Sequence, residues 1–233
     1  MIEVAEVRYR ESRQIRKDLQ RWPRPEADRR VDDPAPRPRP TAGYPSWFAG
    51  WIDRERTATC VCWWEPLLVP GLVQTADYAR ALFVAWQSGN TSDDDVDELV
   101  SARLERQAIF DQPRPPEVWL IIDETVLHRR VGDVKTTYDQ LHHLAAMAKR
   151  PNVTIQVVPA DTGAHVGLLG AFAIATGNGA DTVYTESPDQ GQTTASPAVA
   201  AKLTKTFNIL RGEALPQAAS RELIMKVAEE RWT

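Results

Sequence analysis

Residues 118–122 read Val-Trp-Leu-Ile-Ile, a short apolar run that follows the proline-rich segment 113–116. A run of this length, bounded by turn signals, is typical of a buried β-strand. Gly177-Asn178-Gly179 is typical of a hairpin turn between two strands. Further strands are predicted over 153–158, 171–176 and 182–186. The pattern therefore predicts a small mixed sheet of about four strands.

Helical periodicity flanks these strands on both sides. Thr75 and either Thr91 or Ser92 are typical N-caps, and apolar residues recur at helical spacing after each. Trp47, Trp51 and Glu55 also have helical spacing, and this helix is expected to continue into Cys60–Cys62. Further helices are expected over 136–149, 198–215 and 216–232. We predict a mixed α/β (α+β) domain over 46–233, with helices flanking the sheet.

Residues 1–45 have a different composition. They carry a net charge of +3, ten arginines and seven of the 17 prolines. Val4–Trp22 can form one helix, and the prolines of 23–45 favour an extended Pro/Arg-rich linker, because proline lacks the amide donor. We expect an N-terminal arm whose arginines are solvated, with docking on an acidic partner or nucleic acid as the alternative.

The composition of the whole chain excludes several classes of protein. The net charge of −4 over 233 residues argues against nucleic-acid binding by bulk electrostatics. Two cysteines, both in Cys60-Val61-Cys62, are too few for a disulfide scaffold or a structural zinc site. The sequence has no run long enough to span a membrane and no apolar signal-peptide core at its start. We therefore expect a cytoplasmic protein without metal or cofactor.

Several polar residues stand where chemistry is common in α/β proteins. Glu124 follows the strand 118–122, Glu186 ends the strand 182–186, and His165 lies in a glycine-rich loop. If an enzyme, the chain would use these three residues for proton transfer. The candidate ligand-binding residues are Trp51, Trp64, Arg103, Arg106, Gln107, Glu124 and His165. In the alternative interpretation, Glu124 forms a structural salt bridge with Arg103 or Arg106, and His165 shapes its loop.

Several segments together resemble one known family. They are WEPLLVPGLVQTADYARAL (64–82), SARLERQAIF (101–110), WLIIDETVLHRRVG (119–132), the segment 140–174 and VYTES (183–187). From about Trp47 to its end, the chain resembles the C-terminal domain of actinobacterial antitoxin-like transcriptional regulators, a domain of unknown function. In that family a helix-turn-helix module normally precedes this domain, and residues 1–45 do not offer the helices such a module needs.

The resemblance implies a regulatory module without its own DNA-binding half. It would bind a small-molecule ligand or a small partner protein, and the family's genetic setting favours a protein partner. A homodimer is compatible with this expectation, and direct DNA binding is not expected. The alternative is an enzyme derived from this regulator fold, acting on a small anionic or aromatic substrate.

Overall fold

A mixed six-stranded sheet organises the part of the chain that the computed structural model describes, namely residues 46–86, 92–177, 179–187 and 190–233. The strand order is β3-β2-β1-β4-β5-β6. Strands β1, β2 and β3 are parallel, and β4, β5 and β6 continue the sheet as antiparallel neighbours. The strands are β1 (Cys60–Glu65), β2 (Glu117–Asp123), β3 (Val153–Val158), β4 (Phe172–Thr176), β5 (Thr182–Glu186) and β6 (Gly191–Thr194).

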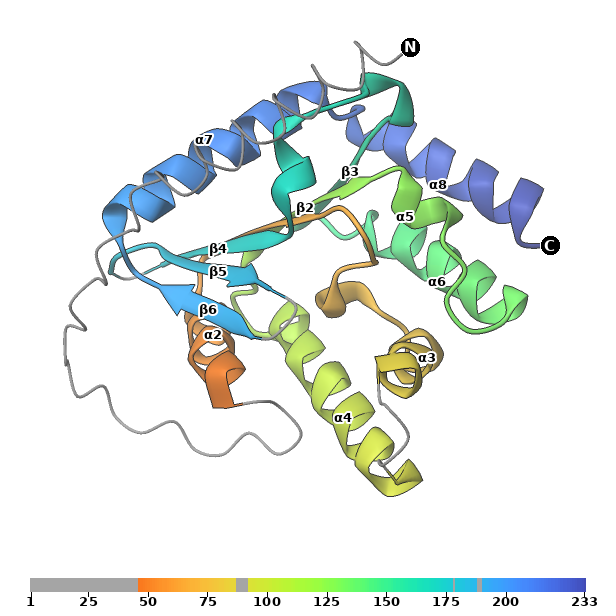
Figure 1. The fold of residues 1–233 in the computed structure, drawn as a ribbon, viewed down its shortest axis with the longest axis horizontal. Coiled ribbons are helices and arrows are strands. Elements are labelled where there is room, and N and C mark those ends of the chain that lie inside the picture. Colours follow the sequence, from red (N-terminus) through yellow and green to blue (C-terminus); the bar gives the residue numbers. More distant parts are fainter. Residues whose placement is uncertain (1–45, 87–91, 178, 188–189) are drawn as a thin grey trace, which may run out of the picture. The chain divides into compact units, whose positions relative to one another are not determined.

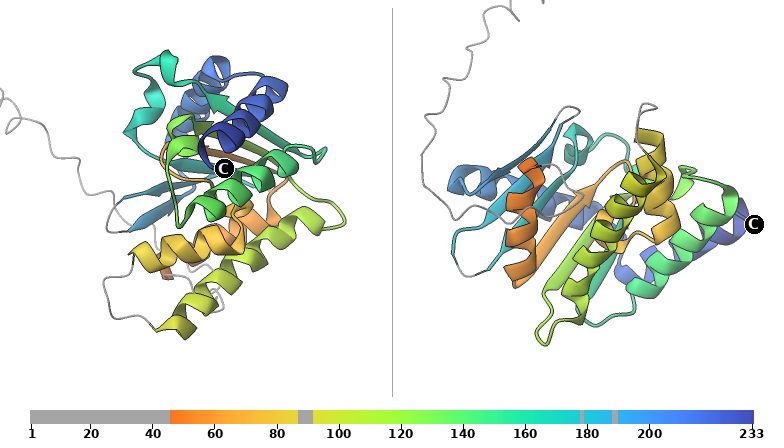
Figure 2. Two further views of the ribbon diagram at one scale, coloured as in Figure 1. Left: turned by 90° about the vertical axis from the view of Figure 1, so that its right-hand side faces the viewer. Right: turned by 90° about the horizontal axis from the view of Figure 1, so that it is seen from below.

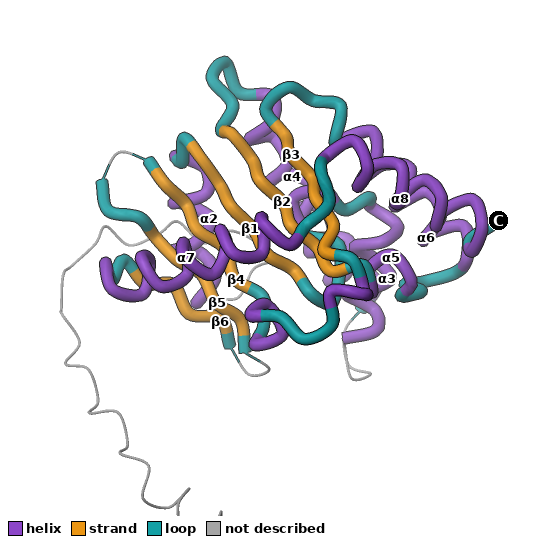
Figure 3. Tube along the Cα trace, turned by 90° about the horizontal axis from the view of Figure 1, so that it is seen from above, coloured by secondary structure: helices purple, strands orange, loops and turns teal. Residues whose placement is uncertain are grey.

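Helices cover both faces of this sheet (Figure 1). Figure 3 shows α7 lying across one face, and Figure 2 shows α2 and α4 on the opposite face. The helices are α2 (Ser46–Thr57), α3 (Ala76–Trp86), α4 (Asp93–Arg106), α5 (Thr125–His128), α6 (Val134–Met147), α7 (Pro197–Glu213) and α8 (Gln217–Arg231). The mixed α+β class is as predicted, whereas the expected helix and linker over 1–45 lie outside the described residues.

The sheet has six strands rather than about four because β1 and β6 were not predicted. The expectation that the helix from Trp47 continues into Cys60–Cys62 is wrong, since α2 ends at Thr57 and Cys60 starts β1. Strand β1 is central and pairs with both β2 and β4. Trp63 and Trp64 point to opposite faces of the sheet, and both are buried because helices cover both faces. The sequence of β1 therefore lacks the alternation of apolar and polar residues that marks a half-buried strand.

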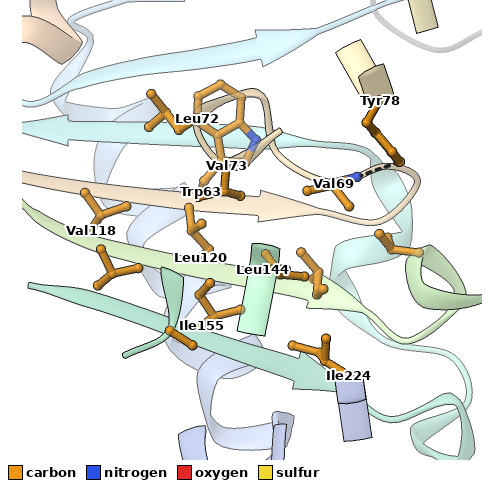
Figure 4. Packing of buried hydrophobic residues seen from close by; sticks show 14 of the residues in the cluster. Trp63, Val69, Leu72, Val73, Tyr78, Val118, Leu120, Leu144, Ile155 and Ile224 are labelled. Carbon is orange, nitrogen blue, oxygen red and sulfur yellow. Dashed lines mark hydrogen bonds between the residues drawn. The ribbon is translucent and has the colours of Figure 1, made fainter. Parts of the chain in front are cut away.

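Two hydrophobic clusters hold the layers together. The larger one lies on the face covered by α2, α6 and α8, where Figure 4 shows Trp63, Leu120 and Ile155 on neighbouring strands. Leu144 of α6 and Ile224 of α8 pack against this row. The second cluster joins the other face to α7, and its members are Trp64, Ile121, Val158, Phe172, Ile174, Val183, Ala200, Phe207 and Leu210. The sheet is thus a rigid support for side chains at its edges.

Two helix starts follow the sequence closely. Ser92 caps α4: its Oγ accepts from the Asp95 N–H, and the Asp95 carboxylate accepts from the Ser92 N–H in return. Asp133 caps α6 by accepting a hydrogen bond from the Thr136 N–H at 2.7 Å. Both caps satisfy amide groups that the first turn leaves without partners. The Ser92 cap was one of two predicted alternatives, whereas the helix expected over 136–149 begins two residues earlier, at Val134 after Asp133.

Candidate functional site

A cavity of about 620 Å³ opens at the carboxyl end of β1, on the sheet face that carries α2 and α4. This volume is within the range of ordinary small-molecule sites. Its polar walls are Glu65 of β1, Glu186 of β5 and two arginines of α4, together with Gln74; Phe48, Trp63 and Tyr184 supply aromatic walls. Strands β2 and β3 extend the sheet on one side of β1, and β4 extends it on the other. In α/β sheets, ligands commonly bind at the strand ends where the strand order reverses in this way.

Ala171, the residue before β4, lines this cavity. The sheet register places Ala173 between Trp63 and Tyr184 in one cross-strand row. Continuing the register by two residues places Ala171 between Glu65 and Glu186, and Ala171 also lines the cavity. Side chains two residues apart share a face, so large groups stand on both sides of two alanines. The hollow follows from this difference in side-chain size.

Glu65 is the most perturbed acid in this cavity. Only 9% of the residue is exposed, and burial raises the pKa of its carboxyl from 4.5 to about 7, with the nearby Glu186 acting in the same direction. The Leu67 N–H donates to Oε1 at 3.2 Å and opposes this rise. Burial also raises the pKa of Tyr184, whose hydroxyl contacts Glu186 at 3.4 Å. Near neutral pH, Glu65 therefore exchanges a proton within the cavity.

Arg103, which also lines the cavity, is held in a fixed position. Its Nη1 donates to Gln74 Oε1 at 2.8 Å, and its guanidinium lies 5.0 Å from the Phe83 ring centre. Gln74 is itself fixed, because its Nε2 donates to the Val69 carbonyl at 2.7 Å. A Cβ at Gly71 would come within 2.6 Å of Arg103 Nη1, so only glycine lets the arginine lie here.

Arg106 forms a buried ion pair in the wall of the cavity. Its Nε and Nη2 donate to the two carboxylate oxygens of Glu55 at 2.8 and 2.7 Å. The side chains are 4% and 1% exposed, and the Trp51 indole N–H also donates to Glu55 at 3.0 Å. The Arg106 guanidinium lies 4.9 Å from the Phe48 ring centre. This network fixes α2 against α4 and neutralises the Arg106 charge.

The structure brings three of the predicted site residues together and separates the others from them. Arg103, Arg106 and Glu186 all line the cavity. Gln107 stands behind it, where its side-chain amide donates to the Gln74 carbonyl at 2.7 Å. Trp51 is fully buried and supports Glu55 rather than lining the cavity.

Trp64 and His165 lie on the opposite face of the sheet, which carries α7. The Trp64 indole N–H donates to the Gly167 carbonyl at 2.9 Å, and its ring meets His165 edge-on. His165 Nδ1 accepts from the Gly167 N–H at 3.2 Å, and its Nε2 lies 3.1 Å from Asp123 Oδ2. Both ring nitrogens are engaged within the protein, which fixes this histidine in its loop.

Glu124 lies outside the cavity as well. Its Oε2 accepts from the Ala160 N–H at 2.8 Å, and its Oε1 lies 3.4 Å from His128 Nε2. The expected salt bridge between Glu124 and Arg103 or Arg106 is wrong, because Arg106 pairs with Glu55 and Arg103 with Gln74. The three proposed proton-transfer residues do not share one site.

Sequence reasoning missed Glu65, Gln74 and Tyr184 as residues of the site. Glu65 ends a strand, the same signal that singled out Glu124 and Glu186, but the sequence pattern assigned Cys60–Cys62 to a helix. Gln74 and Tyr184 lie within two of the segments that carry the family resemblance. Together with Arg103, Ala171 and Glu186, they show that four of these segments meet at the cavity.

The described residues contain no group of three or more His, Cys, Asp or Glu able to hold a metal ion. Within the same ranges, every helix is too short or too polar to cross a membrane. One family model matches residues 48–226, and it is described as a domain of unknown function (DUF5753). No curated protein matches the chain. The matched range contains every lining residue of the cavity.

Proposed function

We propose that this chain, which belongs to the DUF5753 family, binds a small molecule in the cavity beside Glu65 and acts as the sensing half of a regulatory protein. The observation that carries this proposal is the cavity itself, whose aromatic walls stand beside a buried carboxyl with a raised pKa and a fixed arginine. Apolar walls with a few placed polar groups are typical of ligand sites. Catalysis is not required to explain them.

A cavity-filling variant tests the proposal. Wild-type protein and Ala171→Phe are screened against a metabolite library by thermal denaturation. We expect some compounds to raise the Tm of the wild type and to lose this effect in Ala171→Phe, because the new ring occupies the floor between Glu65 and Glu186. Ala218→Phe, at an exposed position of α8, is the matched control. A library without a stabilising compound, or stabilisation that persists in Ala171→Phe, contradicts the proposal.

In such a regulator, another chain or module would recognise the operator DNA. The described domain carries no feature that we would assign to base reading, and its resemblance is to the half of a regulator that follows the helix-turn-helix. We therefore expect no binding when a labelled duplex is titrated at low salt. Binding that weakens steeply as salt rises would show direct contact with DNA phosphates and would refute this part. We place such a module in the cytoplasm, where a small partner protein would receive its signal.

One observation favours an enzyme as a second candidate. Glu65 and Glu186 are two carboxyl groups in one cavity, and burial raises the pKa of Glu65 to about 7. Carboxyls in unlike environments are a common basis for general acid and base roles. Incubation with a metabolite mixture, read by mass spectrometry, distinguishes this candidate. Consumption of a compound by the wild type and not by Glu65→Gln would favour the enzyme over the sensor.

A further inference from the structure

We propose that the ligand of this cavity carries a protonated amine, which binds between the carboxyl groups of Glu65 and Glu186 against the ring of Trp63. This inference rests on the proposed ligand-binding function and names the chemical class of the ligand. It also assigns Glu65 as the residue that selects that class.

The geometry of the sheet supports a cation at this position. Glu65 and Glu186 stand on the same face, one on each side of Ala171, and both line the cavity. Across two strand spacings their Cα atoms are about 10 Å apart. Only the small side chain of Ala171 stands between them in this row, and Glu186 is near enough to act on the Glu65 carboxyl electrostatically.

One buried polar atom at this position has no protein partner among the described residues, namely the indole N–H of Trp63, a residue only 5% exposed. Glu65 is 9% exposed and accepts from the Leu67 N–H at 3.2 Å, and the Leu68 N–H and the Trp63 indole lie near enough to lower the pKa of its carboxyl. Buried polar groups are rarely left unsatisfied. A ligand that donates to Glu65 holds this carboxyl ionised, and an ionised carboxyl is the better acceptor for the Trp63 N–H.

The charges around the cavity also favour a cation once Glu65 is ionised. The charged groups that face it come from α2, α4, β1 and β5: Glu55, Arg103, Arg106, Glu65 and Glu186. Glu55 neutralises Arg106, which leaves Arg103 to balance two carboxylates among the described residues. Tyr78 of α3, on the Glu65 side, has a pKa raised by burial to about 12 and stays neutral. One added positive charge therefore restores neutrality.

An ammonium group fits this site better than a metal ion. A calcium or magnesium ion usually takes six or more oxygen ligands, and here two carboxyls stand beside aromatic rings. Aromatic faces attract ammonium groups, and the neighbouring Phe48 ring already takes the Arg106 guanidinium in this way. An amine on an apolar body would place its charge between the carboxyls and its body against Trp63.

Three matched probes test the amine class by isothermal titration calorimetry: tryptamine, indole-3-ethanol and indole-3-propionate. They share one aromatic body and differ in carrying an ammonium, a hydroxyl or a carboxylate. We expect tryptamine to bind about tenfold or more tightly than either of the others. Glu65→Gln and Glu186→Gln should each remove most of this preference, whereas Glu124→Gln, outside the cavity, should keep it.

Proton release provides a second readout that a merely structural carboxyl would not give. Because the amine stabilises ionised Glu65, its binding at pH 7 should release about half a proton, measured from the dependence of the binding enthalpy on buffer ionisation. Glu65→Gln should abolish this release. Equal affinity for the three probes, no binding of tryptamine, or binding without proton release would overturn the amine class. If the metabolite screen still yields a ligand that Ala171→Phe excludes, the sensing function stands and only the amine class is wrong.

Discussion

Arg106→Met should be among the most destabilising single substitutions in this domain. It removes both hydrogen bonds that the guanidinium donates to Glu55, and it leaves a carboxylate that is 1% exposed with only the Trp51 N–H. Leaving one member of a buried ion pair uncompensated costs about 3–5 kcal/mol. This cost is a large part of the total unfolding free energy of a domain, which is about 5–15 kcal/mol.

Urea denaturation of four proteins measures this effect: wild type, Arg106→Met, Glu55→Met and the double variant. With a slope of about 2–3 kcal/mol per molar urea, each single substitution should lower the midpoint by about 1–2 M. The double variant should lose much less than the two singles together, because it buries no charge and keeps similar side-chain volume. Additive losses, or a loss below about 1 kcal/mol for Arg106→Met, would refute the reasoning.

Three further substitutions test other parts of the structure. The unfolding free energy should fall by up to about 3 kcal/mol as pH rises from 4.5 to 7, because Glu65 keeps its proton over that interval in the folded state and loses it in the unfolded chain. Urea midpoints measured across this pH range should show the fall in the wild type and not in Glu65→Gln. Gly167→Ala should cost about 1–3 kcal/mol in urea denaturation, since the added Cβ overlaps the Trp64 indole, and an unchanged midpoint would contradict the packing. His165→Ala should lower the unfolding free energy by about 1–3 kcal/mol, because it removes a hydrogen-bond partner of Asp123. Calorimetry should show unchanged ligand binding in the cavity, and a loss of binding would show that His165 belongs to the site.

The fold was predictable where short-range signals decide it. The run 118–122 and the cap residue Ser92 each predicted the right element, because local backbone chemistry fixes them, and the two strands predicted on either side of 177–179 pair as antiparallel neighbours. Strand β1 was not predictable in this way. Its first five residues, 60–64, are apolar on both faces, and only pairing with β2 and β4 makes this run a strand. Strand β6, Gly191–Thr194, is short and polar at the sheet edge, so it carries no hydrophobic signal.

The candidate site was half predictable for a related reason. Residue type and position at a strand end singled out Glu186, and a polar cluster on one helix singled out Arg103 and Arg106. The same rule applied to Glu124 selected a residue of another surface, because a strand end does not say which face its side chain occupies. Partners such as Glu55 for Arg106 are 51 positions apart in the chain and have no mark in the sequence.

The sequence by itself determined the mixed α+β class, the helix caps, most of the strands and the kinds of side chain available for a site. The tertiary structure alone decided that β1 is the central strand, that Trp63 and Trp64 face opposite layers, and that Glu65 and Glu186 stand on either side of Ala171. The physical reason is that caps, turns and apolar runs depend on neighbours within a few residues. Burial, and with it the pKa of Glu65, depends on strands and helices that the chain brings together from far apart.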